Sequence, residues 1–247
     1  MTNINDTYFD SHYKEIWRSI IPEVLTVKEI DFMIPYFNLQ PGSNVLDLMC
    51  GYGRHALALG RKGIHVTAID NLPAYIEEIS KKVASENLPV EAVLLPVLDY
   101  VPAQKFDLAI CMGNSLNFFD KDDTRKIFSM VSSCLKPGGN FLINSWSIAE
   151  IIYKNFREHD EGLLGKNPFT TTMKLLFQPA RLEAVTTYTV PGGQTETKKG
   201  IDYIYSLNEL DAFCSSAGLT LRKVYSIPGK KEFSLGEPRA YIIAEKN

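Results

Sequence analysis

An acidic residue and two glycines stand close together in the segment Val45–Gly53, which reads Val-Leu-Asp-Leu-Met-Cys-Gly-Tyr-Gly. The apolar residues predict a buried β-strand with Asp47 near its end. Gly51 and Gly53 lack a Cβ atom, so the chain can turn sharply there and let a ligand reach backbone N–H groups. The helix predicted to follow points its free N–H groups into the same space. With Asp47 as an acceptor for a cationic group, this segment indicates a site for a polar, charged cofactor.

A second acid, Asp70, ends the next apolar segment. Its carboxylate offers two acceptor oxygens, which matches the vicinal hydroxyls of a ribose. The glycine turn Gly51-Tyr-Gly-Arg-His-Ala56 also satisfies the dinucleotide fingerprint, with Asp70 near the spacing expected of its ribose acid. A nicotinamide-dependent oxidoreductase is therefore one alternative. Asp47 argues against it, because the strand before that fingerprint is normally apolar.

The elements that would position these acids alternate between strand and helix. Two helical stretches, split near Pro22, are predicted within residues 11–36. Strands are predicted at 44–49, 64–69, 90–95, 106–112 and 140–145. Helices between them are predicted at 54–60, 72–86 and 121–135. This alternation predicts a parallel sheet, and the handedness of the crossovers makes it a doubly wound α/β fold.

The pattern changes in the last third of the chain. A hairpin turn is predicted at Pro191–Gln194, between strands of a small antiparallel sheet with one wet face. Its threonine-rich, alternating strands are predicted at 170–177, 182–190 and 195–205. A helix at 207–217, stopped by Gly218, and strands at 219–226 and 239–245 close the sequence.

Taken together, these features resemble the class I S-adenosylmethionine-dependent methyltransferases. The resemblance rests on Asp47, the loop Cys50-Gly-Tyr-Gly-Arg-His-Ala56, Asp70, Phe106-Asp107 and Leu135-Lys-Pro-Gly-Gly139. It covers roughly residues 35–147 well and the remainder loosely, and is closest to small-molecule methyltransferases. It implies a Rossmann-like fold with a seven-stranded, mostly parallel sheet and a small antiparallel β insert. The implied units are a cofactor-binding domain over 1–156 and 207–247, and an insert over 157–206 that forms a lid or substrate wall.

The resemblance implies S-adenosylmethionine as cofactor and S-adenosylhomocysteine as its product. The amino acid end of the cofactor would lie over Asp47 and the glycine turn, with Arg54 available to its carboxylate. Asp70 would hold the ribose. The usual adenine-binding acid would align with Pro96, or else be displaced to Asp99. The full set of expected cofactor residues is Tyr13, Asp47, Gly51, Gly53, Arg54, Asp70, Asn71, Leu72, Val97, Leu98, Asp99, Met112 and Gly113.

The implied reaction is an in-line displacement at a methyl group that the sulfonium already activates. Most of the catalysis is then alignment in a dry site, and a general base helps where the acceptor arrives protonated. The candidates for such a base are His12, Tyr13 and His159. Tyr13 belongs to an aromatic N-terminal segment, Tyr8–Trp17, of the kind that closes over the cofactor. His55 is expected to be structural.

The acceptor is expected to be a small molecule that presents nitrogen, oxygen or a carboxylate. The segment after strand 106–112 lacks the Asn/Asp-Pro-Pro-aromatic motif that methylates exocyclic amines of nucleobases. Rim residues are expected at Asn114, Ser115 and Asn117. Further side chains could line the pocket or belong to core or surface: Trp146, Arg181, Tyr188, Tyr203 and Tyr205. A non-catalytic S-adenosylmethionine-binding protein is a further alternative, because Met49 and Pro96 depart from the family pattern.

Composition narrows the class of protein. The 247 residues carry a net charge of −3, which provides no basic footprint for nucleic acid. The four cysteines are scattered without metal-ligand spacing, so free thiols, no metal site and a cytoplasmic location are expected. No apolar run approaches ~18 residues, so no membrane span is expected. A monomer or homodimer is expected.

Overall fold

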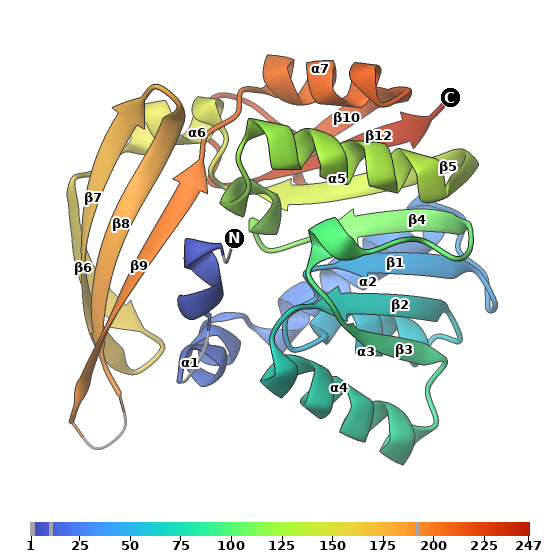
Figure 1. Cartoon of the computed structure of the whole chain (residues 1–247), viewed down its shortest axis with the longest axis horizontal. Coiled ribbons are helices and arrows are strands. Elements are labelled where there is room, and N and C mark those ends of the chain that lie inside the picture. Colours follow the sequence, from blue (N-terminus) through green and yellow to red (C-terminus); the bar gives the residue numbers. More distant parts are fainter. Residues whose placement is uncertain (1–2, 10–11, 191–192) are drawn as a thin grey trace.

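The structure, a computed structural model, describes residues 3–9, 12–190 and 193–247. A large sheet with helices on both faces stands beside a smaller sheet, and the N-terminal end of the chain lies between the two (Figure 1). Pro191 and Gly192 of the predicted turn lie outside the described residues. On either side of them, the Val190 N–H donates a hydrogen bond to the Gln194 carbonyl at 2.8 Å.

The large sheet has the strand order β11-β10-β12-β5-β4-β1-β2-β3. Strands β1 to β5 are parallel to one another, whereas β12 is antiparallel to β5 and to β10, and β11 is antiparallel to β10. The doubly wound α/β prediction is confirmed, and the seven expected strands are joined at one edge by the two-residue β11. The strand bounds are β1 (Asn44–Leu48), β2 (His65–Asp70), β3 (Val90–Leu94), β4 (Phe106–Cys111), β5 (Leu135–Ser145), β10 (Leu219–Ile227), β11 (Lys231–Glu232) and β12 (Ala240–Lys246).

Strand β5 begins at Leu135, five residues earlier than the sequence predicted. Phe106 pairs with Leu135, and the register then shifts before Leu108 pairs with Asn140. The Lys136 ammonium contacts Asp107 Oδ1 at 2.7 Å across this irregularity. The Lys-Pro-Gly-Gly segment is therefore a bulged start of the strand rather than a turn before it.

Helices cover both faces of the large sheet because successive β1 side chains point to opposite sides. Val45 belongs to the core beneath α2, α3 and α4, whereas Leu46 belongs to the core beneath α5 and α7. Asp47 shares the face of Val45. The helices are η1 (Ile4–Thr7), α1 (Tyr13–Ile20), α2 (Glu23–Tyr36), α3 (Arg54–Gly60), α4 (Pro73–Glu86), η2 (Val97–Asp99), η3 (Ser115–Phe118), α5 (Lys121–Cys134), α6 (Ala149–Asn155) and α7 (Leu207–Ser216). Among the described residues, none of them is both long and apolar enough to cross a membrane.

The smaller sheet, called here the insert sheet, is antiparallel with the order β6-β7-β8-β9. Its strands are β6 (His159–Leu164), β7 (Asn167–Phe177), β8 (Ala180–Thr189) and β9 (Thr195–Tyr203), all within the predicted insert of 157–206. Strand β6 was not predicted, because its sequence His-Asp-Glu-Gly-Leu-Leu has neither alternation nor β-branched residues. The division into two domains stays a prediction.

The N-terminal segment, residues 3–9 and 12–20, joins the two sheets. Tyr13 and Ile16 pack against Tyr188 of β8 in a small apolar cluster. The Asn5 side chain donates to the Ile201 carbonyl at 2.9 Å and accepts from the Ile201 N–H at 2.9 Å, so η1 is fixed to β9.

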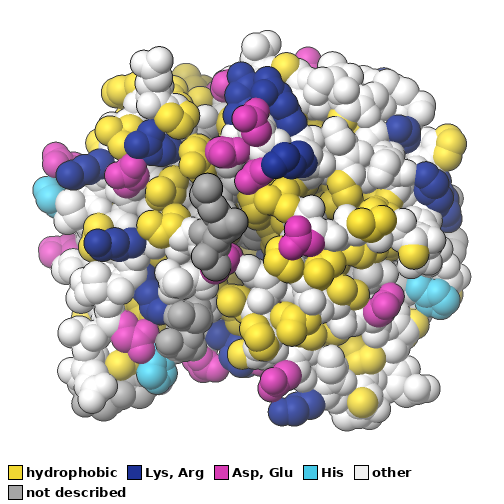
Figure 2. All heavy atoms as spheres, viewed as in Figure 1, with side chains coloured by type: hydrophobic (Ala, Val, Ile, Leu, Met, Phe, Trp, Pro, Cys, Tyr) yellow, Lys and Arg dark blue, Asp and Glu magenta, His cyan; other side chains and the backbone are white. Residues whose placement is uncertain are grey.

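Figure 2 shows acidic and basic side chains interspersed over one face of the whole molecule.

Candidate active site

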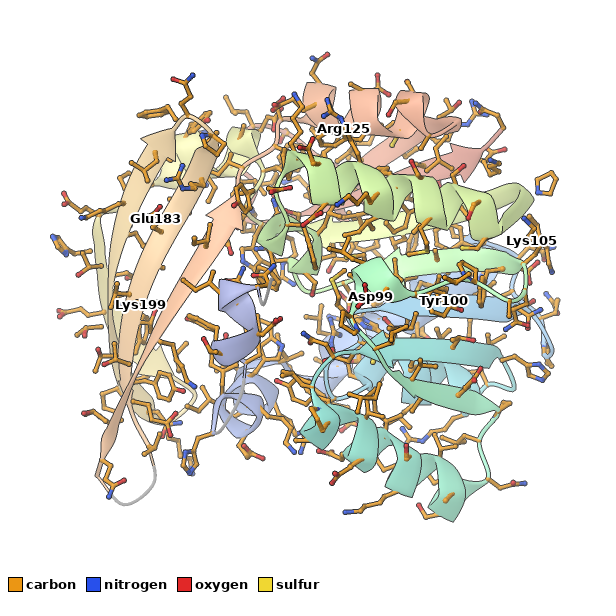
Figure 3. All side chains as sticks on the ribbon, viewed as in Figure 1. Asp99, Tyr100, Lys105, Arg125, Glu183 and Lys199 are labelled. Atoms are coloured by element: carbon orange, nitrogen blue, oxygen red, sulfur yellow. The ribbon has the colours of Figure 1, made fainter. Side chains whose placement is uncertain are left out.

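A cavity of about 840 Å³ lies between the carboxyl ends of the parallel strands, the N-terminal segment and the insert sheet. All thirteen expected cofactor residues except Gly53 line it. They arrive from α1 and from the loops after β1, β2, β3 and β4, which meet at one edge because parallel strands end together. Figure 3 shows Asp99 at the end of the large sheet that faces the insert, and Lys105 at the opposite end.

The two glycines of the turn after β1 have different tasks. Both adopt left-handed backbone, with φ of +56° at Gly51 and +75° at Gly53. A Cβ at Gly53 would lie 2.6 Å from Cγ1 of Ile79 in α4, whereas a Cβ at Gly51 would meet nothing within 4 Å. Gly53 therefore permits close packing of α3 on α4, and Gly51 opens on the cavity. Met49, where the family pattern favours glycine, keeps a positive φ of +53°.

Asp70 is connected to the glycine turn. Its Oδ2 accepts a hydrogen bond from the Gly51 N–H at 2.9 Å, and its Oδ1 accepts one from the Leu72 N–H at 3.0 Å. The carboxylate is 7% exposed, and burial raises its pKa to about 6 against the opposing effect of these backbone donors. Each oxygen has a second acceptor site, so Asp70 can hold its loop and two ligand hydroxyls together.

Asp47 is 1% exposed, and its Oδ2 has no hydrogen-bond partner among the described residues. Burial raises the pKa of Asp47 to about 7; the Arg54 charge opposes this shift and the Asp70 charge adds to it. Buried carboxylate oxygens in native proteins nearly always have a donor. An unpartnered oxygen beside a cavity therefore points to a cationic donor supplied by a ligand, such as the ammonium group of S-adenosylmethionine.

Arg54 lines the cavity but is already engaged. Its Nη1 donates to Glu29 Oε2 at 2.5 Å and to Thr26 Oγ1 at 3.0 Å. Glu29 also contacts His55 Nε2 at 2.9 Å and accepts from the Tyr241 hydroxyl at 2.7 Å. The expected binding of a cofactor carboxylate by Arg54 stays a prediction. Sequence reasoning missed Glu29, because a lone acid in an α2 helix carries no signal of such a hub.

Burial and neighbouring charges set the pKa values of Glu29 and His55. Glu29 with its partners Arg54, His55 and Tyr241 is called the Glu29 hub below. Burial raises the pKa of Glu29, but the hydrogen bonds and charges of His55 and Arg54 outweigh it and bring the pKa to about 2. Burial, with the Arg54 charge, lowers the pKa of His55 to about 4 against the pull of Glu29. His55 is thus a neutral, buried histidine at pH 7, in the structural role expected of it.

The adenine side of the cavity is formed by loops after β2 and β3. Val97, Leu98 and Asp99 form the short helix η2, in which Val97 is buried and the other two are exposed. The Asn71 side chain donates to Asp6 Oδ1 of η1 at 2.8 Å. Asn71 thus holds the N-terminal segment across the cavity, in addition to the adenine contact that the resemblance implies for it.

Of the three candidate bases, the structure brings only Tyr13 to the cavity. His12 is exposed and pairs with Glu196 at 2.5 Å, and His159 is exposed on β6 beside Thr172. Neither lines the cavity, so the structure does not support a base at either histidine. Burial raises the pKa of Tyr13 well above its usual value, which keeps the phenol neutral and unsuited to accept a proton. Tyr13 is therefore part of an aromatic wall.

That wall continues through stacked rings. The rings of Tyr13 and Trp17 are stacked, with centroids 6.1 Å apart. The rings of Trp17 and Trp146 are tilted, with centroids 5.9 Å apart. Of the other pocket candidates, Tyr188 and Tyr205 are core residues and Arg181 pairs with Glu183. Tyr203 lies outside the cavity lining. Trp146 alone of these five forms part of the site.

Asp202 of β9 lines the cavity and was missed by sequence reasoning. Its Oδ2 accepts hydrogen bonds from Ser147 Oγ at 2.6 Å and from Asn114 Nδ2 at 3.0 Å. Burial raises its pKa to about 6, opposed by these two donors. The signal in the sequence was an acid between Ile201 and Tyr203 in a predicted strand, the same signal that marked Asp47.

Two of the expected rim residues, Asn114 and Ser115, do line the cavity. The Asn114 Oδ1 accepts from the N–H groups of Trp146 and Ser147 at 2.9 and 3.0 Å. Asn117 instead donates to the Tyr203 carbonyl at 2.8 Å, outside the cavity. These amides fix the end of β9 against the ends of β4 and β5.

Comparison with known proteins supports the cofactor side of this site. Residues 45–139 match a protein family described as "Methyltransferase domain". The chain is 28% identical over 116 residues to the S-adenosyl-L-methionine-dependent Diels-Alderase iccD of Talaromyces variabilis, covering 45% of this chain and 39% of that protein. It is 24% identical over 174 residues to the carboxy-S-adenosyl-L-methionine synthase of Yersinia enterocolitica, covering 66% and 62%. The chain thus spans less than two thirds of either relative.

Solved structures extend the likeness to the whole fold. A S-adenosylmethionine-dependent methyltransferase from Clostridium acetobutylicum superposes with a TM-score of 0.82 at 19% identity, covering 98% of this chain and 99% of that one. Other structures of this fold hold S-adenosylmethionine or S-adenosylhomocysteine. The orphaned oxygen of Asp47 and the open side of Gly51 fit that cofactor. Residues 45–139 therefore match a methyltransferase domain, and the whole chain has the fold of solved S-adenosylmethionine-dependent methyltransferases.

Proposed function

We propose that this chain transfers the methyl group of S-adenosylmethionine to a nitrogen, oxygen or carboxylate atom of a small molecule held under the insert sheet. The observation that carries the proposal is the unpartnered Oδ2 of the buried Asp47, next to Gly51 and Asp70. A carboxylate in that position would accept a hydrogen bond from the ammonium group of the cofactor. Asp70 would accept hydrogen bonds from the ribose hydroxyls.

The rest of the cavity supports a small acceptor. Five residues of the insert sheet form its far wall: Met173, Leu182, Ala184, Gly200 and Asp202. The N-terminal segment closes the cavity between the two sheets. Such a site would exclude water and hold the reactants in line, which is most of what methyl transfer requires.

The cofactor supplies a methyl group activated by a positively charged sulfur. The residues of this chain bind and orient. Asp47 would bind the ammonium group of the amino acid portion, and Asp70 would bind the ribose hydroxyls. Met112 and Gly113 form the floor after β4, and the aromatic wall of Tyr13, Trp17 and Trp146 would position the acceptor.

Two measurements test the proposal. Calorimetry with S-adenosylhomocysteine and, separately, with NAD should show binding of the first alone, and the reverse would favour the oxidoreductase alternative. Incubation with S-adenosylmethionine and a panel of amines, alcohols, phenols and carboxylic acids should release S-adenosylhomocysteine with a methylated acceptor. Binding without turnover on any acceptor class would favour the non-catalytic alternative. Mass spectrometry of the cofactor separates methyl transfer from conversion of the cofactor itself, the activity named for the Yersinia relative.

We also propose that the protein is cytoplasmic. All four cysteines are free thiols, and three of them are buried, which suits a reducing cytoplasmic setting. We propose no nucleic-acid or membrane partner. The choice between monomer and homodimer is open to measurement by light scattering.

A further inference from the structure

We infer that Asp202 is a catalytic residue that binds a protonated amine and accepts its proton, so that the acceptor of this enzyme is an amine. The inference rests on the proposed function, because it assigns the acceptor class within the same cavity. Asp202 comes from the insert sheet, whereas Asp47 and Asp70 come from the large sheet. Besides the carboxylates of the large sheet and of the short helices η1 and η2, the cavity therefore has a carboxylate on the wall that the insert sheet forms.

Asp202 is held rigidly at the end of the cofactor floor. Its Oδ2 is fixed by Asn114, the residue that directly follows Gly113, and by Ser147. Asn114 adopts left-handed backbone with φ of +70° and carries two backbone N–H groups on its Oδ1. Among the described residues, Oδ1 of Asp202 has no hydrogen-bond partner, and it is the oxygen left for a ligand.

The groups that face Asp202 favour a cation beside it. Tyr8 and Tyr13 of the N-terminal segment are close enough to interact with its charge, and burial keeps the pKa of both phenols raised, so they stay neutral. The Tyr8 hydroxyl donates to Thr186 Oγ1 at 3.3 Å. Arg239 also lines the cavity, and its side chain interacts with the Tyr241 hydroxyl of the Glu29 hub. Aromatic faces next to an anion form a favourable box for an ammonium group.

The proton and electron balance is complete without a co-reactant. The ammonium group gives one proton to the Asp202 carboxylate and becomes a neutral amine. The nitrogen lone pair then forms the N–C bond to the methyl, and the electrons of the S–C bond return to sulfur as a neutral thioether. The methylated amine leaves as an ammonium ion, and Asp202 returns its proton to water.

Other acceptor classes fit this wall poorly. A carboxylate acceptor would be repelled by Asp202. An alcohol is far too weak an acid for a carboxyl base to ionise. A phenol has a reference pKa of about 10, close to that of an alkyl ammonium at about 10.4, but it arrives neutral, so the Asp202 carboxylate has no charge on it to attract. An amine alone arrives with a charge that Asp202 attracts.

The test uses two cofactor analogues. Sinefungin, in which a carbon bearing an amine replaces the sulfur of S-adenosylhomocysteine, presents an ammonium group where the transferred methyl would be. Wild-type protein should bind sinefungin more tightly than S-adenosylhomocysteine by roughly tenfold or more, as a charge-assisted hydrogen bond would give. In Asp202→Asn that preference should disappear while the affinity for S-adenosylhomocysteine stays the same. The asparagine oxygen can still accept from Ser147 and Asn114, so the fold is expected to hold, and its melting temperature checks this.

Glu183→Gln is the matched control. Glu183 is a carboxylate on β8 of the same sheet, paired with Arg181 at 2.9 Å and outside the cavity lining (Figure 3). It should leave the preference for sinefungin and all turnover unchanged. On the amine panel, Asp202→Asn should lose about 10²- to 10⁴-fold in kcat/KM, the range of general-base catalysis. Equal sinefungin preference in wild type and Asp202→Asn would overturn the inference. Failure of the wild type to bind S-adenosylhomocysteine would instead overturn the proposed function.

Discussion

The Gly51 N–H donates a hydrogen bond to Asp70 Oδ2 at 2.9 Å, which makes the glycine turn after β1 and the acid after β2 one unit. The Leu72 N–H binds the other carboxylate oxygen. A ligand that contacts Asp70 therefore also contacts a loop whose shape Asp70 maintains. Removing this carboxylate is expected both to weaken cofactor binding and to disturb the local structure of the turn.

Asp70→Ala should lower the affinity for S-adenosylhomocysteine by at least ~100-fold, because two ligand hydroxyls and two backbone donors lose their acceptor. Calorimetry at pH 7.5 measures this loss. Glu91→Ala is a suitable control, since Glu91 is exposed on the neighbouring β3 and pairs in register with Thr67. Unchanged affinity in Asp70→Ala would refute the cofactor site as described.

Alanine at the two glycines of the turn should separate packing from binding. Gly53→Ala places a Cβ 2.6 Å from Ile79 on backbone with φ of +75°, so it should lower the free energy of unfolding by roughly 1–3 kcal/mol. Gly51→Ala meets no atom within 4 Å, so its main effect should be on affinity for S-adenosylhomocysteine. Urea unfolding and calorimetry on both variants check this. Equal losses of stability would show that backbone strain alone decides both positions.

The sequence predicted which residues of the cofactor half come together at one cavity, because its signals are local. Asp47 and Asp70 end apolar strands, and parallel strands bring such ends together. The acceptor half depends on contacts that no local pattern contains. Asp202 meets Asn114 and Ser147 only after the insert folds over the sheet, across sequence separations of 88 and 55 residues. The histidines were chosen by residue type, and both lie on the surface.

The raised pKa of Asp47 predicts that cofactor binding releases a proton. Its folded pKa of about 7 means that the carboxyl is partly protonated at neutral pH, and a bound ammonium group favours the anion. Affinity for S-adenosylhomocysteine should therefore rise as the pH increases from 5.5 to 7.5. Calorimetry in two buffers of different ionisation enthalpy would count the protons. Asp47→Asn should remove the part of this dependence above pH 6.5 and leave the part due to Asp70, whose pKa is about 6; a flat affinity in the wild type would contradict the assignment.

The same residue should lower stability in the absence of ligand. A folded pKa above the usual 3.8 means that Asp47 costs stability as the pH rises from 3.8 through 7. Without ligand, Asp47→Asn should thus melt at a higher temperature than wild type at pH 8, and the difference should shrink at pH 5. Thermal scans at the two pH values measure it. A lower melting temperature at pH 8 would mean that Oδ2 of Asp47 has a stabilising partner in the ligand-free protein.

The Glu29 hub predicts loss of stability in mild acid. His55 has a folded pKa of about 4, below its usual 6.5, so its contribution is full above pH 6.5 and is lost as the pH falls to 4. Glu29, with a folded pKa of about 2, loses its contribution below its usual 4.5. At pH 7, Glu29→Gln should cost about 3–5 kcal/mol by leaving Arg54 without its ion-pair partner. Tyr241→Phe should cost only about 1 kcal/mol by removing one hydrogen bond. Urea unfolding that gave equal costs would refute the ion-pair account.

Asn114 is a positioning residue for Asp202, and it has a readout that a purely structural role would not move. Its Nδ2 donates to Asp202 Oδ2 at 3.0 Å and lowers the pKa of that carboxyl. Removing this donor in Asn114→Ala should raise the pKa of Asp202, so the midpoint of the pH–rate profile should move above 6. Ser147→Ala removes the second donor and should move the midpoint in the same direction. Midpoints that stay in place while turnover falls would mean that Asp202 is not the group whose ionisation controls the rate.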